Sequence, residues 1–143
     1  MQRYIKVSIH DLVGLKLEKL PNSSEWRIPS FKTRTVINKI WIQGIVKQIS
    51  GDFGDQIEVQ DQIQDSTSSV TVRGCLNVPN GLPPGLYSGE YCQILGKIIA
   101  ASINDEKKGQ NSVLIQAQKI VHIRDPVLRD MWPLEVKEMK RII

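Results

Sequence analysis

The chain has 143 residues and a formal net charge of +4, with 41% hydrophobic and 24% charged residues. This balance excludes an intrinsically disordered chain, and no stretch approaches the roughly 18 consecutive apolar residues of a membrane-spanning helix. Because the N-terminal stretch MQRYIKVSIHDL has polar and charged groups within any apolar run, it is unlike a signal peptide, and we expect one soluble domain without a membrane partner.

The first 35 residues predict an N-terminal lead-in of short elements. Tyr4–Val7 has the pattern of a short strand. Ser8 suits the N-cap of a brief helical turn that ends at Gly14, and Glu25–Ile28 predicts an edge strand before a proline.

From Val36 to residue 124 the pattern predicts a β-barrel. Alternating apolar residues place the five strands at 36–49, 57–61, 70–74, 91–101 and 113–123. Gly44 and Gly96 interrupt the two longest strands, as bend glycines of a tightly coiled barrel do. The proline-rich stretch 77–89 predicts a long third connection without a long helix. This describes an all-β protein, a five-stranded Greek-key OB-fold barrel followed by a helix.

Residues 125–143 predict one amphipathic C-terminal helix. Asp125 is a good N-cap, and Pro126 suits the first helical position. Apolar side chains recur at helical spacing at Leu128, Met131, Trp132, Val136, Met139, Ile142 and Ile143. Pro133 predicts either a kink in one helix or a turn followed by a helix that starts there. The apolar stripe must be buried, whether on the chain's own barrel, on a different protein or on a second copy, and the stripe alone leaves these alternatives open.

The distribution of charge weakens a role in binding nucleic acid. Single strands bind OB barrels through aromatic platforms in a basic groove. The segment Gly51–Asp65 has five acidic residues and no basic one, and Phe53 lies within it. Trp41 and Tyr91 fall within strand patterns, where core packing is the more common role. We therefore expect weak or indirect DNA binding. A single-strand DNA-binding OB subunit, as in replication protein A or a telomere-end complex, is the alternative function.

No residue pattern predicts catalysis or a metal site. His10 and His122 are the only histidines, and neither has a candidate nucleophile or glycine elbow beside it. Cys75 and Cys92 lie within apolar strand patterns and lack metal-ligand spacing, so two reduced core thiols are expected. We predict a protein that is not an enzyme and needs no cofactor.

Several short strings carry a resemblance to a known family. They are Trp41-Ile-Gln-Gly44 with Val46, Val72-Arg-Gly74, Val78-Pro79, Gly89-Glu-Tyr91 before Gly96, Gln116-Ala117 with Lys119, and Trp132-x-Leu134-Glu-Val136. In their order and spacing the chain resembles the RecQ-mediated genome instability protein 2 family. That family supplies the small OB subunit of a complex that joins a Bloom-type RecQ helicase to topoisomerase III. The resemblance covers residues 36–143 well and the first 35 loosely, and Pro133 departs from it.

The resemblance implies a non-catalytic nuclear scaffold. Such a subunit pairs through C-terminal helices with a larger OB subunit, RecQ-mediated genome instability protein 1, and stabilises a complex that dissolves double Holliday junctions and suppresses crossovers. The apolar helix residues named above are then the partner-binding residues. The resemblance also implies a docking site for a peptide of a Fanconi-anaemia M-type translocase, bordered by Lys119 and Trp132.

Overall fold

The computed structural model describes most of the chain. The described residues are 4–14, 17–23, 25–27, 36–63, 66–79, 81–104 and 110–142. Ile28, the last residue of the predicted edge strand, lies outside them.

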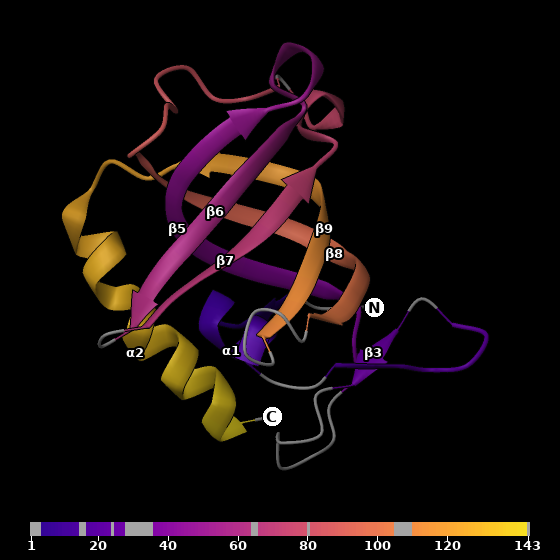
Figure 1. Cartoon of the computed structure of the whole chain (residues 1–143). Coiled ribbons are helices and arrows are strands. Elements are labelled where there is room, and N and C mark those ends of the chain that lie inside the picture. Colours follow the sequence, from indigo (N-terminus) through magenta and orange to yellow (C-terminus); the bar gives the residue numbers. More distant parts are fainter. Residues whose placement is uncertain are drawn as a thin grey trace.

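Five strands close into the predicted barrel, seen face-on in Figure 1. They are β5 (Lys39–Ser50), β6 (Gln56–Ile63), β7 (Ser66–Arg73), β8 (Tyr91–Asn104) and β9 (Gln110–His122). Their order is β5-β6-β7-β9-β8, and β8 pairs back onto β5 to complete the ring. All neighbours are antiparallel except β7 and β9, which are parallel. This is the OB fold, and the predicted fold class is confirmed.

The barrel core follows from the alternation of apolar side chains along the strands, which is interrupted at bulges. In β5, for example, Ile40, Ile42 and Val46 are fully buried. The two bend glycines are needed because the backbones approach closely. A Cβ at Gly44 would stand 2.5 Å from the carbonyl oxygen of Gln60, and one at Gly96 would stand 2.4 Å from the carbonyl oxygen of Gln116.

The N-terminal segment closes one end of the barrel. Strand β1 (Ile5–Lys6) adds in parallel to β5, and α1 (Ile9–Gly14) follows it. The backbone N–H of Asp11 donates to the Ser8 hydroxyl oxygen at 3.0 Å, which is the predicted N-cap. The apolar residues Ile9, Leu12 and Val13 of α1 are buried against the barrel strands. The barrel is therefore plugged by α1 and not by the C-terminal helix (Figure 1).

A small second sheet lies beside the barrel. It consists of β2 (Glu18–Lys19), β3 (Trp26–Arg27) and β4 (Val36–Ile37). The long first strand predicted from Val36 is thus divided: β4 pairs with β3, and only the part from Lys39 belongs to the barrel. Trp26 is buried, and its indole N–H donates to the carbonyl oxygen of Ile98 at 3.1 Å.

Two 3-10 turns and a loop occupy the other end of the barrel. The turn η1 (Asp52–Gly54) joins β5 to β6, and η2 (Cys75–Asn77) follows β7. The described part of the connection from η2 to β8 contains no longer helix, as the prolines predict.

The C-terminal helix α2 spans Pro126–Ile142 and continues through Pro133 without a break. Its first turn is capped by Asp125, whose carboxylate accepts the backbone N–H of Val127 at 2.9 Å. Within the described residues, no helix is long and apolar enough to cross a membrane.

Candidate partner-binding surface on the C-terminal helix

One face of α2, here called the docked face, packs on the outside of the chain's own barrel. It consists of Trp132 and Val136, which are buried, and Met139, which is partly buried. The Trp132 ring stacks on Trp41 of β5, with centroids 6.3 Å apart and an interplanar angle of 27°. Neither indole N–H has a hydrogen-bond partner among the described residues, so apolar packing holds this pair together.

Three polar contacts fix the helix along the barrel. The Lys6 ammonium lies 3.1 Å from the Glu135 carboxylate and 4.5 Å from the centre of the Trp41 ring. Near the helix C-terminus, Lys140 forms an ion pair of 2.6 Å with Asp11 of the barrel plug.

The third contact is at the start of the helix, where the Arg129 guanidinium lies 4.7 Å from the centre of the Tyr91 ring. A cation above an aromatic face is attracted to the ring electrons. The helix is thus held at its start, its middle and its end.

A second face of α2 carries large apolar side chains that are about half exposed and that no described element covers. This exposed face consists of Val127, Leu128, Met131 and Leu134, with 59%, 51%, 48% and 65% of each residue exposed. Val127, Met131 and Leu134 are spaced by four and three residues, which places them on one side of the helix, and Leu128 borders them. Large apolar side chains that are exposed next to one another are typical of binding surfaces.

The structure thus divides the predicted partner-binding residues between two faces. Trp132, Val136 and Met139 lie on the docked face, whereas Leu128 and Met131 lie on the exposed face. The side chains of Ile142 and Ile143 lie outside the described residues. Val127 and Leu134 were not among the predicted residues, although their spacing about Met131 is visible in the sequence and could have identified them.

Lys119, the other predicted binding residue, is exposed on β9. In the strand register it pairs with Leu95, and Leu95 pairs with Trp41. Neighbouring strands lie about 4.8 Å apart, and two such spacings separate Lys119 from Trp41, so the two residues are roughly 10 Å apart across the strands. Lys119 and the Trp41–Trp132 pair therefore belong to the same outer face of the barrel.

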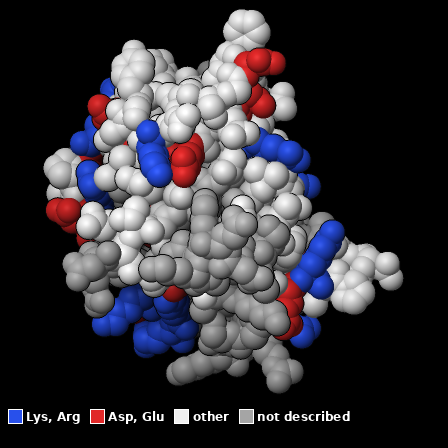
Figure 2. All heavy atoms as spheres, in the orientation of Figure 1, with Lys and Arg blue, Asp and Glu red and all other residues white. Residues whose placement is uncertain are grey.

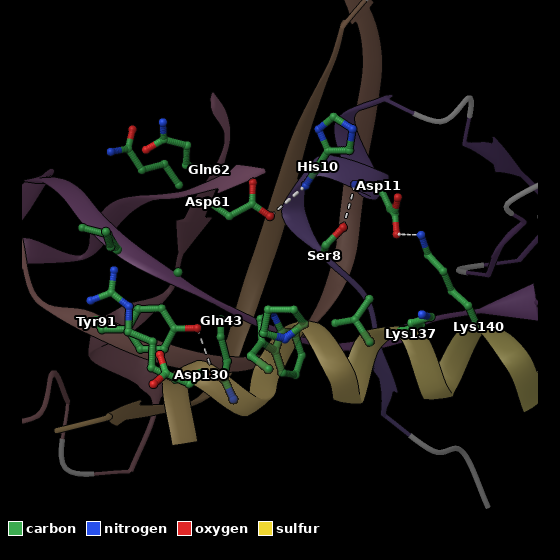
Figure 3. Close-up of a pocket in the computed structure, with 17 residues that line it drawn as sticks. Ser8, His10, Asp11, Gln43, Asp61, Gln62, Tyr91, Asp130, Lys137 and Lys140 are labelled. Atoms are coloured by element: carbon green, nitrogen blue, oxygen red, sulfur yellow. Dashed lines mark hydrogen bonds and ion pairs between the residues drawn. The ribbon is translucent and has the colours of Figure 1, made fainter. Parts of the chain in front are cut away.

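A groove of about 800 Å³ lies along the side of α2 that is opposite to its exposed face (Figure 3). It is bounded by α2, α1 and strands β5 and β6. In it, the Asp61 carboxylate accepts the backbone N–H of His10 at 3.1 Å, and burial raises the pKa of this carboxyl. The Tyr91 hydroxyl donates to the Gln43 side chain at 3.0 Å, and burial raises the pKa of Tyr91 as well.

The described residues in and beside this groove do not form the catalytic triad of a hydrolase, because Ser68, which does not line the groove, is the hydroxyl that lies near His10. Ser68 is 3.4 Å from Nδ1 of His10, but Asp61 binds the His10 backbone and not its ring. Ser68 is also nearly fully buried.

The two cysteines are buried and unpaired, and neither is an activated nucleophile. Burial raises the pKa of the Cys75 thiol to about 11 and that of Cys92 to about 12. Both thiols are therefore protonated at neutral pH, and the protonated form is a poor nucleophile.

His122, the second histidine, has a structural contact. Its Nδ1 accepts the Arg124 N–H at 3.2 Å, so its Nε2 carries the proton that faces Glu90 at 3.1 Å. Arg124 also donates to the carbonyl oxygen of Pro84 at 3.1 Å, which ties the loop before β8 to the end of β9.

The closed barrel and its outer helix define an OB-fold protein, and solved structures share this fold. The chain superimposes on a chain of a replication protein A heterotrimer bound to single-stranded DNA with a TM-score of 0.61 and 12% identity, covering 96% of this chain and 94% of that one. For the S. pombe Stn1–Ten1 complex the values are 0.54 and 17%, covering 99% and 100%. At these identities the likeness concerns the fold alone.

The sequence relatives are more specific. The sequence model of the family described as RecQ-mediated genome instability protein 2 matches residues 5–140, and the chain belongs to this family. It is 29% identical to the Gallus gallus protein of that name over 122 residues, 82% of this chain and 80% of the relative. It is 32% identical to the Mus musculus protein over 105 residues, 73% of this chain. The chain spans only 60% of the length of that mouse relative.

Proposed function

We propose that the chain is a non-catalytic OB-fold scaffold subunit that pairs with a larger OB-fold protein through the exposed face of α2. In this role it stabilises a nuclear complex of a RecQ helicase and topoisomerase III that processes recombination intermediates. Membership of the RecQ-mediated genome instability protein 2 family supports the complex. The observation that carries the mode of pairing is the exposed face itself.

The arrangement of α2 suits pairing by a preformed surface. Because Trp132 and Val136 already hold the helix on the barrel, the exposed face is presented without a folding step. A preformed surface avoids the ordering cost that a free helix would incur on binding. The four apolar side chains of the exposed face are already about half covered, so each would gain only roughly 1–1.5 kcal/mol on full burial, before the costs of association are subtracted.

Co-expression with the larger OB subunit tests the proposal. Met131→Asp places a charge in the centre of the exposed face, and we expect it to weaken pairing at least about tenfold because an unpaired charge is costly to bury. Lys137→Asp is the matched control, since Lys137 is exposed but lines the groove on the opposite flank. Pairing that survives Met131→Asp unchanged would contradict the proposal.

A further inference from the structure

The C-terminal helix α2 rests mainly on the N-terminal segment of the chain. Among the described elements, β1 is the one whose backbone contacts that of α2 most extensively. This short strand is held by its parallel pairing with β5 and by the Val7 N–H, which donates to the carbonyl oxygen of Trp41 at 3.1 Å. The placement of α2 therefore depends on residues that precede the barrel in the sequence.

The middle of α2 is a fixed point. The Trp132 ring stacks on Trp41, and Glu135 forms its ion pair of 3.1 Å with Lys6 of β1. A helix that is held at one point can still tilt about it, and the tilt decides the direction in which the exposed face of α2 points. A further contact toward the C-terminus is needed to set this angle.

That contact is the ion pair of 2.6 Å between Asp11 of α1 and Lys140 of α2. Helix α1 holds Asp11 in place, because its apolar residues are buried in the barrel end and the Asp11 N–H donates to the Ser8 hydroxyl oxygen at 3.0 Å. Only 12% of the Asp11 side chain is exposed. Water therefore screens this ion pair less than it screens a pair of fully exposed charges, which contributes little.

The groove makes this ion pair the support of the C-terminal half of α2 on that side. A space of about 800 Å³ separates α2 from β5 and β6 there, and Asp11 and Lys140 both line it. Figure 3 shows their side chains reaching toward each other from α1 and from α2. Among the described residues, no other ion pair crosses the groove.

The C-terminal half of α2 is rich in basic side chains, which include Lys137, Lys140 and Arg141. Figure 2 shows Lys and Arg atoms gathered at the lower left of the molecule, where this half of the helix lies in Figure 1. A carboxylate on α1 attracts this end of α2 toward the barrel. Asp11 supplies that carboxylate.

We infer that Asp11 is a positioning residue for pairing with the larger OB subunit. Through Lys140 it sets the angle of α2, and with it the direction of the exposed face, although Asp11 does not belong to that face. If the ion pair is lost, α2 samples several angles, and the affinity falls in proportion to the fraction of molecules that keep the binding-competent one. The inference rests on the proposed function, since the surface that Asp11 orients is the one that binds the larger OB subunit.

An exchange of the two charges tests the inference by calorimetric titration with the larger OB subunit. Lys140→Asp brings two carboxylates together, and we expect pairing to weaken about tenfold, as when about one molecule in ten keeps the binding-competent angle. Adding Asp11→Lys to that variant restores the ion pair with its charges exchanged, and pairing should return to within about threefold of the wild type. A double variant that is folded but binds no better than Lys140→Asp would mean that Lys140 touches the partner itself, which overturns the inference.

Two further variants accompany this exchange. Arg141→Asp is the matched control, because it makes the same change in charge one residue away, and the ion pair of Arg141 is with Glu138 of the same helix. This control should pair within about twofold of the wild type. Lys140→Met removes the ion pair without adding repulsion and should weaken pairing about fivefold. Thermal unfolding shows whether each variant is folded.

Distances between spin labels in the isolated chain show directly whether Asp11 orients α2. The labels are attached to Gln48→Cys on β5 and Glu138→Cys on α2, which are exposed positions, whereas the native cysteines are buried. We expect one narrow distance distribution with the native Lys140, and a broader or shifted one with Lys140→Met. An unchanged distribution overturns the inference, and this measurement decides the matter if the variant with exchanged charges does not fold.

The inference and the proposed function can fail separately. If the wild-type chain does not pair with the larger OB subunit, the proposed function fails, and the spin-label distances still decide whether Asp11 holds α2 in place. If the wild-type chain pairs and Lys140→Asp pairs within about twofold of it, the inference is overturned and the proposed function stands.

Discussion

At the scale of single residues, Trp132 stabilises the fold of its own chain by packing α2 onto the barrel. Its ring is 5% exposed and stacks on Trp41. We predict that Trp132→Ala lowers the free energy of unfolding by about 3 kcal/mol, because a large buried ring is lost and the site cannot fully collapse. Urea denaturation followed by circular dichroism measures this change.

Leu128 provides the matched control for Trp132. It is half exposed on the adjacent face of α2, so Leu128→Ala should change stability by no more than about 0.5 kcal/mol while weakening partner binding. Equal stabilities of the two variants would show that α2 does not dock on its own barrel as described.

Asp61 gives a prediction about pH. Burial raises the pKa of its carboxyl in the folded chain above its ordinary value of 3.8. In the pH range between the unfolded and folded pKa, the folded state binds more protons, so stability falls as pH rises through that range. Asp61→Asn, whose amide oxygen can still accept the His10 N–H, should remove this fall and raise stability at pH 7. Melting temperatures from pH 3 to pH 7 test this, and an unchanged slope would contradict it.

At the scale of elements, α1 and α2 have separate tasks. Since α1 fills the barrel end with Ile9, Leu12 and Val13, the barrel does not need α2 as a plug. A chain that ends at Pro126 should therefore still unfold cooperatively, at lower stability because Trp41 loses its cover, and should no longer bind the larger OB subunit. Thermal unfolding and co-purification measure the two effects.

Removal of residues 1–14 is the contrasting change. It takes away β1 and the plug. We therefore expect that the shortened chain no longer unfolds cooperatively and that it binds a hydrophobic dye, because its core is exposed. A molten chain after removal of α2, together with a well-folded one after removal of α1, would reverse these assignments.

The sequence was sufficient to predict the main barrel strands and the two α-helices, because their signals are local. Alternation marked the barrel strands, Ser8 and Asp125 marked the helix starts, and Gly44 and Gly96 marked the close backbone approaches. The division of the first strand at Asn38 was missed, because it depends on pairing with β3, a partner distant in sequence.

At the scale of the whole molecule, the position of the apolar surfaces could not be read from the sequence. The helical stripe combined Trp132 with Leu128, but only the placement of Trp41 decides which of them is buried. Similarly, the left-handed backbone of Phe53 has no signal in the sequence. Among the described residues, the folded molecule presents the exposed face of α2 as an uncovered apolar surface, as the proposed scaffold role requires.

Calorimetric titration of the chain with the larger OB subunit at several temperatures tests the central claim most directly. The account predicts saturable one-to-one binding with a negative heat-capacity change, the mark of apolar burial, and loss of that binding in Met131→Asp but not in Lys137→Asp. Absence of binding to the OB subunit, together with tight and strongly salt-dependent binding of a single-stranded oligonucleotide by the isolated chain, would contradict it.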